Sequence, residues 1–504
     1  MRTFAFLLIL PCILFIGCNN SHTSPSTETI TPESQGISSQ AILDFIQAAE
    51  TERPDDLHSF ILMRHGKKLA EGYWNPYNPE SNHMLYSLSK SFTSTATGMA
   101  QAEGLLSIND PVISFFPEET PENPSENLQA MRIRDLLRMT TGHQNDALGP
   151  MLQNQESWVK GFLELPVEHK PGTHFVYNTA ATFMLSAIIQ KVTGENLVEY
   201  LTPRLFKPLG IDTPVWEQNM DGISFGGWGL NIRTKDIASF GQLYLQKGAW
   251  KGEQLIPAAW VEEATTLQTS NGSNPDSDWE HGYGYQFWRC KTGVYRGDGA
   301  FGQYCIVMPE LDAVVAITSG TSDMQAIMNL VWEHLMPAMQ EESLPENPSA
   351  YEALQEKLAD LSLSVVEGDS TSYLENEIAE KTFAISDNNM GITAGVLNID
   401  DREALVTFTV NGEKVTVPVG FGEMKRVAFP FPTENSISSL GEQKIATSAG
   451  WIAPDTLQVR SYLYETPYYF TFNLAFEGDE VTIQGKQNVA FGDTRLPVIT
   501  GKPE

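Results

Sequence analysis

The spacing of apolar residues changes near residue 350, and this change most constrains how the chain can fold. Between about residues 40 and 340, helical and strand patterns alternate, whereas after about residue 362 apolar residues recur at every second position. A period of 3.6 buries one face of a helix, and a period of two buries one face of a strand. The sequence therefore predicts an α+β domain followed by a separate β-barrel or β-sandwich, and 504 residues are long enough for both.

Strands are expected at both ends of the α+β block, with helices between them. A hairpin over 59–74, turning at His65-Gly66, opens the block. We expect further strands over 284–289, 304–308 and 313–318, and helices over 87–103, 133–139, 180–192, 197–201, 235–246 and 324–339. Strands from both ends of one block predict a single antiparallel sheet flanked by helices.

The β block follows an acidic, Pro-containing stretch at 341–350 and a short helix expected over 351–361. Asn411-Gly412 separates two alternating runs, and these residue types adopt the positive φ angles of a type I′ hairpin turn. The alternation continues over 456–464, 468–476 and 481–484. We therefore expect an antiparallel meander that forms a barrel-like all-β domain.

The N-terminus has the features of an export signal. Arg2 precedes an apolar run over 4–16, which is shorter than the roughly 20 residues of a membrane-spanning helix. Residues 14–18 (Leu-Phe-Ile-Gly-Cys) resemble the bacterial lipobox. This resemblance implies that Cys18 is lipidated and becomes the first mature residue.

The charge balance restricts the partners of the mature chain. There are 32 Lys and Arg against 63 Asp and Glu, a net charge of −31, so no surplus of cations can replace counterions on nucleic acid or bind anionic lipid.

Residues 18–40, rich in Ser, Thr and Pro, predict a flexible tether. Asn19 stands where an Asp would favour inner-membrane retention, so we expect a bacterial cell-envelope protein held at the outer membrane by its lipid alone.

The cysteines and histidines do not form a recognisable metal or redox motif. After removal of the signal, Cys290 and Cys305 remain for the folded body, and the sequence contains no C-x-x-C. One disulfide is an alternative, but two buried thiols are favoured. The nine histidines show no H-E-x-x-H, and no Gly-rich phosphate loop is present, so no metal or cofactor is expected. His83 and His143 are candidate pocket residues, but a surface or core position is the favoured interpretation of both.

Three serines occur in patterns that are typical of nucleophiles. Ser224 is the centre of a G-x-S-x-G sequence, but the strand and the helix that this motif needs on either side are not predicted. S-x-x-K occurs at Ser87 and at Ser157. Ser157 is adequately explained as the N-cap of a short helix.

Ser87 begins a long helix of small and apolar residues, a pattern that indicates a buried helix. A buried helix start offers free N–H groups and the positive end of the helix dipole to a developing oxyanion. Lys90 lies one turn later on the same face, and burial lowers the proton affinity of a lysine so that it can act as a base. Ser87 is therefore the favoured nucleophile.

The residues around Ser87 resemble the first motif of the serine β-lactamase-related family, which includes class C β-lactamases, D,D-peptidases and carboxylesterases. Residues 85–93 (Leu-Tyr-Ser-Leu-Ser-Lys-Ser-Phe-Thr) carry this resemblance. Residues 175–179 (Phe-Val-Tyr-Asn-Thr) resemble the second motif, Tyr-x-Asn, and residues 297–302 (Gly-Asp-Gly-Ala-Phe-Gly) are similar to the third. The three motifs in order imply a β-lactamase/penicillin-binding-protein-like fold.

The resemblance completes the predicted division of the chain. The expected parts are a lipoprotein signal peptide, a tether, a β-lactamase-related serine hydrolase domain, a linker helix and a β-rich domain, over residues 1–17, 18–40, 41–345, 346–361 and 362–504 respectively.

The resemblance also implies roles for four residues. Ser87 would be the acylated nucleophile and Lys90 its activator. Tyr177 would be the general base, with its phenolate favoured by the neighbouring ammonium, although without the motifs a core tyrosine would be the preferred interpretation. The backbone N–H groups of Ser87 and Ala300 would form the oxyanion hole.

Two positions depart from the family pattern. Thr179 replaces the Asn of Tyr-x-Asn, and Asn178 stands one position early, which leaves the role of that side chain open. The third motif has Gly297-Asp298 where a Lys or His is usual, and Lys291-Thr292-Gly293 lies in an expected hairpin turn. That cation normally holds a substrate carboxylate, so an esterase or amidase is favoured over a β-lactamase unless Arg296 substitutes.

The leading hypothesis is a lipid-anchored serine hydrolase that cleaves an ester or amide bond, in a small molecule or peptide, through an acyl-enzyme on Ser87. The altered motifs also allow an envelope binding or sensing protein that retains the scaffold without turnover. A third hypothesis is a D,D-carboxypeptidase or D-aminopeptidase.

Overall fold

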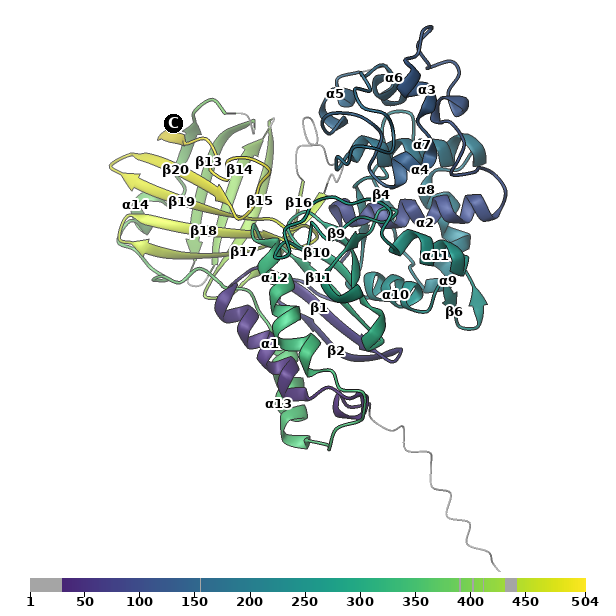
Figure 1. The fold of residues 1–504 in the computed structure, drawn as a ribbon. Coiled ribbons are helices and arrows are strands. Elements are labelled where there is room, and N and C mark those ends of the chain that lie inside the picture. The colour runs from purple at the N-terminus through teal and green to yellow at the C-terminus, as the bar shows by residue number, and fades with distance from the viewer. Residues whose placement is uncertain (1–29, 155, 389–390, 401–402, 411, 431–441) are drawn as a thin grey trace, which may run out of the picture.

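The computed structural model describes residues 30–154, 156–388, 391–400, 403–410, 412–430 and 442–504. They form an α+β domain and a β-barrel beside it (Figure 1). The predicted signal peptide and Cys18 lie outside the described residues. No helix in the described ranges is long and apolar enough to cross a membrane.

A six-stranded antiparallel sheet forms the centre of the first domain. β1 from the beginning of the domain pairs with β11 from its end, from Arg64 opposite Ala313 to Leu57 opposite Ser319. The predicted sheet built by both ends of the domain is therefore confirmed. The strand order is β2 (Lys67–Tyr73), β1 (Leu57–Arg64), β11 (Ala313–Ser319), β10 (Gln303–Met308), β9 (Tyr295–Gly299) and β8 (Trp288–Arg289).

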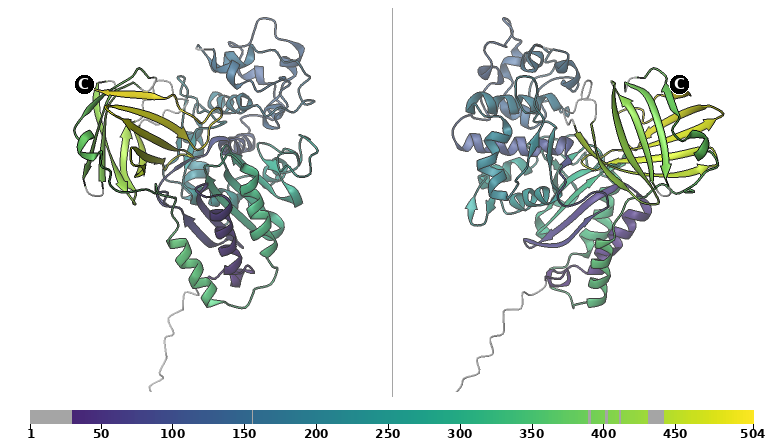
Figure 2. Two further views of the ribbon diagram at one scale, coloured as in Figure 1. Left: turned by 90° about the vertical axis from the view of Figure 1, so that its left-hand side faces the viewer. Right: turned by 180° about the vertical axis from the view of Figure 1, so that it is seen from behind.

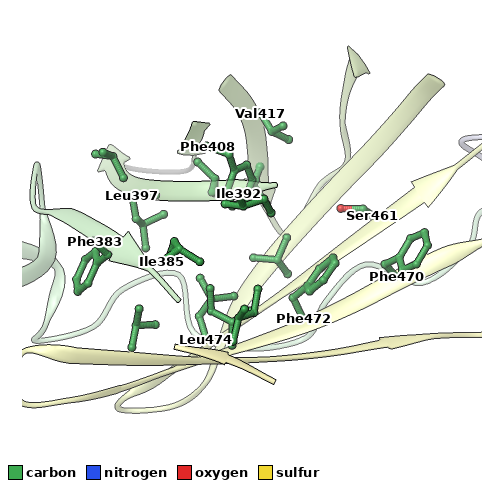
Figure 3. Close-up of a pocket in the computed structure, with 18 of the residues that line it drawn as sticks. Phe383, Ile385, Ile392, Leu397, Phe408, Val417, Ser461, Phe470, Phe472 and Leu474 are labelled. Atoms are coloured by element: carbon green, nitrogen blue, oxygen red, sulfur yellow. The ribbon is translucent and has the colours of Figure 1, made fainter. Parts of the chain in front are cut away.

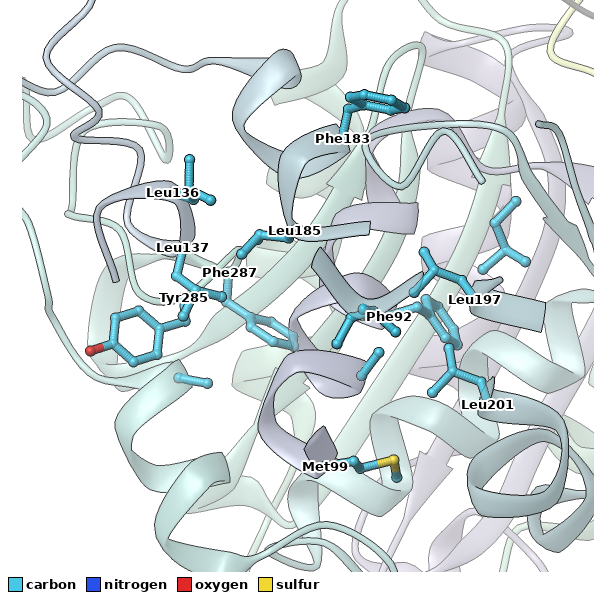
Figure 4. Close-up of a cluster of buried hydrophobic side chains, with 14 of the residues drawn as sticks. Phe92, Met99, Leu136, Leu137, Phe183, Leu185, Leu197, Leu201, Tyr285 and Phe287 are labelled. Atoms are coloured by element: carbon cyan, nitrogen blue, oxygen red, sulfur yellow. The ribbon is translucent and has the colours of Figure 1, made fainter. Parts of the chain in front are cut away.

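Helices cover both faces of this sheet. Consecutive residues of a strand point to opposite faces, so each central strand contributes side chains to the apolar cluster on either face. On β11, Val314 and Ala316 join the apolar cluster that includes Phe92 of α2 (Ser89–Ala102) and Phe240 of α10 (Thr234–Leu245); Figure 4 shows part of this cluster around Phe92. Val315 faces the other cluster, which includes residues of α1 (Ser39–Glu52) and α12 (Met324–Leu330). Burial on both faces explains why β11 is apolar from Ala313 to Ile317.

Further helices and short strands complete the α+β domain. The helices are α3 (Glu126–Ala130), α4 (Ile133–Leu137), α5 (Leu148–Leu152), α6 (Trp158–Leu163), α7 (Thr179–Thr193), α8 (Leu197–Leu201), α9 (Lys207–Leu209) and α11 (Ala258–Thr265). The short strands are β3 (His83–Met84), β4 (Val215–Trp216), β5 (Leu230–Ile232), β6 (Ala249–Trp250) and β7 (Glu253–Gln254).

The second domain is a closed barrel, as the period-two pattern predicts. Nine strands close a ring in the order β15-β14-β13-β12-β21-β20-β19-β18-β17, because β15 pairs with β17 at Gly420–Ser448 and Phe421–Ala449; β16 is attached to β17 outside the ring. The helices α13 (Pro348–Ala359) and α14 (Glu375–Ile378) precede the barrel. The strands are β12 (Thr382–Ile385), β13 (Ile392–Asp400), β14 (Glu403–Val410), β15 (Glu413–Phe421), β16 (Lys425–Pro430), β17 (Glu442–Ala453), β18 (Thr456–Leu463), β19 (Tyr469–Glu477), β20 (Glu480–Gln487) and β21 (Ile499–Pro503).

The barrel packs directly against the α+β domain, as the three views in Figures 1 and 2 show. Tyr462 of β18 is fully buried in the apolar cluster that covers one face of the central sheet. The Tyr77 hydroxyl donates to the Thr466 carbonyl at 2.9 Å, and the Asn488 amide donates to the Gly320 carbonyl at 2.9 Å. Residues of both domains therefore meet in this cluster, and the barrel has a further apolar cluster of its own.

Two predicted elements are much shorter in the structure than expected, and one observed helix was not predicted. The strand expected over 284–289 is present only at Trp288–Arg289, because Gln286 has a φ of 64° that interrupts extended backbone. The helix expected over 324–339 is α-helical only to Leu330 and ends in a π turn and a 3₁₀ turn that contains Pro337. The helix α1 was not predicted.

Candidate active site

Ser87 lies in a 3₁₀ turn, Tyr86–Leu88, that leads directly into α2. Tyr86 has a φ of 46°, a left-handed conformation that is rare in a bulky residue and persists only where its surroundings fix it. Here the Ser89 hydroxyl donates to the Tyr86 carbonyl at 2.6 Å, and the Leu85 N–H donates to the Leu230 carbonyl at 3.0 Å. These bonds hold the turn that presents Ser87.

Lys90 is buried beside Ser87 and has three hydrogen-bond acceptors around its ammonium. Nζ lies 3.1 Å from the Ser87 hydroxyl, 3.3 Å from the Thr179 hydroxyl and 2.8 Å from the Gly227 carbonyl oxygen. Only 1% of Lys90 is exposed, so the desolvation of its charge is nearly complete. The helical spacing thus brings the S-x-x-K lysine into contact with the serine, as the sequence predicts.

Burial lowers the pKa of Lys90 to about 7, whereas the carboxylates of Asp146 and Asp298 raise it. Desolvation therefore outweighs the attraction of the two acids. A substantial fraction of Lys90 is unprotonated at neutral pH, and an unprotonated amine can accept a proton from Ser87.

Tyr177 also contacts both Ser87 and Lys90. Its hydroxyl is hydrogen-bonded to Ser87, and the centre of its ring is 4.9 Å from Lys90 Nζ. The ring stacks on Trp288, with ring centres 5.2 Å apart, and meets Tyr283 edge to face. Burial, and after it the Asp298 carboxylate, raises the pKa of Tyr177, so the phenol is protonated at neutral pH.

In the second motif, where Asn stands one position early, Thr179 and Asn178 make different contacts. The Thr179 hydroxyl, at the position where the family has Asn, contacts Lys90 at 3.3 Å. Asn178 instead caps α7, because its side chain accepts from the Ala181 N–H, and its amide donates to the Thr141 hydroxyl at 3.3 Å. The shift by one residue thus turns the amide away from Lys90 and into the core.

The third motif packs against the residues that carry Ser87. A side chain at Gly297 would overlap Leu88 and Ser91, and one at Gly299 would overlap the Leu85 carbonyl oxygen. The absence of side chains at these two positions allows β9 to lie directly against the nucleophile turn. Ala300 follows the last residue of β9, beside this turn, where its N–H is a candidate oxyanion donor.

Arg296 does not offer a free positive charge to a substrate. Its guanidinium is fully buried and forms an ion pair with Asp298, with Nη2 and Oδ2 2.8 Å apart. It also lies over the Trp279 ring at 4.7 Å. Lys291 lies in the turn between β8 and β9, as expected.

The last residue of the G-x-S-x-G stretch, Gly226, and the next residue, Gly227, contribute backbone carbonyls that face α2. Ser224 is fully buried, but the Gly226 carbonyl accepts from the Thr93 hydroxyl at 2.8 Å and the Gly227 carbonyl accepts from Lys90. Sequence reasoning missed this contact, because it joins segments 137 residues apart. Ser157, the other candidate, is the N-cap of α6 and accepts from the Lys160 N–H at 3.3 Å.

The two candidate histidines are part of the core. His83 is 3.0 Å from His58, ring nitrogen to ring nitrogen, and His143 is 2.9 Å from the Thr141 hydroxyl. Burial lowers the pKa of both His83 and His143 to about 4, so both are neutral. Cys290 and Cys305 are both free and buried, in agreement with the favoured interpretation.

The barrel domain reaches the edge of this site. The Tyr468 hydroxyl is hydrogen-bonded to that of Tyr86, next to Ser87. Phe491 packs edge to face on Tyr86, with ring centres 5.6 Å apart, and also meets Phe301, next to Ala300, at 4.9 Å. Phe301 has a φ of 65°, so aromatic residues with a strained backbone lie beside both candidate oxyanion donors. Phe491 is 78% exposed, which leaves most of its ring accessible.

Comparison with known protein families shows the family of the chain. A family model described as Beta-lactamase matches residues 57–329, which is more than half of the chain. The chain belongs to the Beta-lactamase family. It is thus placed among hydrolases, and the β-lactamase-like fold expected from the three motifs is confirmed.

Two of the similar curated proteins have names that state an activity. The 6-aminohexanoate-dimer hydrolase of Paenarthrobacter ureafaciens is 26% identical over 296 residues, which cover 53% of this chain and 73% of the relative. A candidate D-alanyl-D-alanine carboxypeptidase of Escherichia coli (strain K12) is 25% identical over 189 residues, covering 35% and 42% of the two chains.

Solved structures show the same fold. A candidate 6-aminohexanoate-dimer hydrolase from Bacillus anthracis superposes with a TM-score of 0.51 at 21% identity, over 60% of this chain and 83% of that one. A candidate beta-lactamase from Bacteroides dorei gives a TM-score of 0.50 at 15% identity, over 59% and 99%. At these identities the likeness concerns the fold alone.

Proposed function

We propose that this chain is a serine hydrolase that cleaves an ester or amide bond through an acyl-enzyme on Ser87. The observation that carries the proposal is the contact of Lys90 with Ser87 at 3.1 Å, together with a pKa of about 7 for Lys90. The amine and the hydroxyl are within proton-transfer distance, and the amine is partly unprotonated at neutral pH.

In the proposed reaction, neutral Lys90 accepts the proton of Ser87 as the serine oxygen attacks the carbonyl carbon. The N–H groups of Ser87 and Ala300 hold the oxyanion. Tyr177, which is protonated and hydrogen-bonded to Ser87, donates its proton to the leaving alkoxide or amine and is reprotonated by Lys90. Water then attacks the acyl-enzyme, and the protons return by the reverse route.

The preferred substrates are esters or amides without a carboxylate next to the scissile bond. A carboxylate would need a free cation, and Arg296 is buried and already neutralised by Asp298. The exposed ring of Phe491 at the edge of the site favours an apolar group on the substrate.

We further propose that the protein is anchored in the bacterial cell envelope by a lipid on Cys18. The lipobox-like residues 14–18 and the Ser- and Thr-rich sequence that follows them support this. Expression in the presence of radiolabelled palmitate is expected to label the wild type and not the Cys18→Ser variant. Equal labelling of both proteins would refute the anchor.

Substrate profiling of the chain from Asn19 onward tests the catalytic proposal. We expect turnover of p-nitrophenyl esters and of uncharged amides, weak or absent hydrolysis of β-lactams, and loss of ester turnover by at least a thousandfold in Ser87→Ala. Release of D-Ala from a muropeptide at a higher kcat/KM would favour the carboxypeptidase alternative. Absence of turnover from every class would favour the binding or sensing alternative.

A further inference from the structure

The barrel encloses a cavity of about 290 Å³ that the proposed catalytic reaction does not use. Figure 3 shows side chains from opposite walls of the barrel that point into it, among them Phe383, Leu397, Phe408 and Phe472. Its volume is at the lower limit of ligand-binding pockets in proteins, which range from about 300 to 1,000 Å³.

The lining is apolar on every side. Inward-facing residues alternate along the strands, as on β19, where Phe470, Phe472, Leu474 and Phe476 all contribute. No charged residue lies among the lining residues that the structure describes, and Ser461 provides their one side-chain hydroxyl. Such a surface favours the binding of hydrocarbon.

This cavity is not simply a core that is packed from both sides. Protein interiors are close-packed, and gaps larger than a water molecule are few. Yet Phe408, Phe470, Leu474 and Ile483 are only partly buried, although they point inward. Large apolar cavities with such walls stay dry and bind small apolar molecules.

Ser461 makes the two ends of the cavity chemically different. It lies opposite Phe470 in the β18–β19 pair, and the next residue, Tyr462, is buried in the core shared with the α+β domain. The hydroxyl therefore lies toward the end of the barrel that faces the α+β domain. The opposite part of the cavity, around Phe383 and Leu397, has only apolar side chains (Figure 3).

We propose that the C-terminal barrel binds a single acyl chain, with the hydrocarbon along the barrel axis and its small polar end near Ser461. The closed ring of strands admits a slender molecule from an end rather than a broad one from the side. The site is separate from Ser87, so it requires no covalent step.

Gly395 permits a direct test, because a side chain there would fill the cavity. It faces Phe383 and Phe408 across neighbouring strands, and the one atom within 4 Å of an added Cβ is Cδ1 of Ile385, at 3.9 Å. Gly395→Leu should therefore fold. It should also raise the Tm, because glycine weakens a strand and the leucine fills space. Thr407→Leu, on the outer face of β14, is the matched control.

Binding is measured on the full mature chain with 11-(dansylamino)undecanoic acid, whose fluorescence increases in apolar surroundings. We expect saturable binding by the wild type, by Thr407→Leu and by Ser87→Ala, and at least tenfold weaker binding by Gly395→Leu. Binding of the probe by Ser87→Ala would show that this site does not depend on the proposed nucleophile.

Competition identifies the source of the chain. Displacement of the probe by decanoic acid alone assigns the site to a free fatty acid, and displacement by phosphatidylethanolamine vesicles assigns it to the acyl chain of a membrane lipid. Absence of saturable binding, displacement by neither competitor, or unchanged binding by folded Gly395→Leu would overturn the proposal.

Discussion

At the scale of single residues, burial acts on two neighbours of Ser87 in opposite directions. It lowers the pKa of Lys90, whose charged form is the protonated one, and raises that of Tyr177, whose charged form is the deprotonated one. Both groups are thereby moved toward neutrality. The expectation of a Tyr177 phenolate came from the ammonium beside it, but the sequence could not show how completely the pair is desolvated.

The pH dependence of turnover follows from the Lys90 pKa. Because the unprotonated amine is the proposed base, kcat/KM for p-nitrophenyl acetate is expected to rise with pH through a midpoint near 7. The Asp146 carboxylate raises the pKa of Lys90, so Asp146→Asn is expected to move this midpoint to lower pH. Glu156→Gln, which removes another exposed acid of the same domain, is the control and should leave it in place. A midpoint that does not move in Asp146→Asn would exclude Lys90 as the titrating base.

Asp146 also shows what sequence reasoning misses at this scale. Ser87, Lys90, Tyr177 and Thr179 belong to recognisable local patterns, and the structure brings all four together. Asp146 belongs to no pattern and reaches the site through the tertiary fold, where its carboxylate accepts from the Thr179 N–H at 3.0 Å.

At the scale of secondary-structure elements, the predicted helices and strands match the structure where the sequence pattern is long, and fail where distant contacts shape the backbone. The predicted buried helix after Ser87 and the hairpin β1–β2 are both present, because their apolar periods are long and uninterrupted. The strand expected over 284–289 was largely wrong. The Gln286 side chain donates to the carbonyls of Leu136 and Leu137 and accepts from Thr182, contacts that hold the backbone out of the strand and depend on distant segments.

The cap of α7 is expected to contribute to stability. Asn178→Ala removes the cap and the buried amide contacts with Thr141 and Ala147, so the free energy of unfolding should fall by about 1–2 kcal/mol in urea denaturation. Ser157→Ala removes a simpler cap from the short α6 and should cost less. An equal or smaller loss for Asn178→Ala would contradict the structural role given to its amide.

At the scale of the whole molecule, the change of period near residue 350 was sufficient to predict two domains of different class. It could not predict that the barrel reaches the edge of the active site, because Tyr468 and Phe491 are separated from Tyr86 by more than 380 residues. Nor could it predict a cavity, since alternation shows which residues face inward but not whether they fill the space.

The contact between the domains is expected to influence substrate preference. Phe491→Ala removes an exposed ring beside Ser87 and should lower kcat/KM for p-nitrophenyl hexanoate severalfold more than for the acetate, with little change in Tm. Val498→Ala, an exposed apolar residue elsewhere on the barrel domain, should leave the ratio unchanged. Equal losses for both esters in Phe491→Ala would show that the ring does not contact the acyl group.

The central claim is that Ser87 is the nucleophile, and a fluorophosphonate probe tests it most directly. The thermal melt of each protein first shows that it is folded. The probe is then added to the wild type, Ser87→Ala, Ser157→Ala and Ser224→Ala, and any modified peptide is identified by mass spectrometry. The account predicts one labelled peptide, containing Ser87, in every protein except Ser87→Ala. Labelling of folded Ser87→Ala, or a label on Ser157 or Ser224 in the wild type, would contradict it.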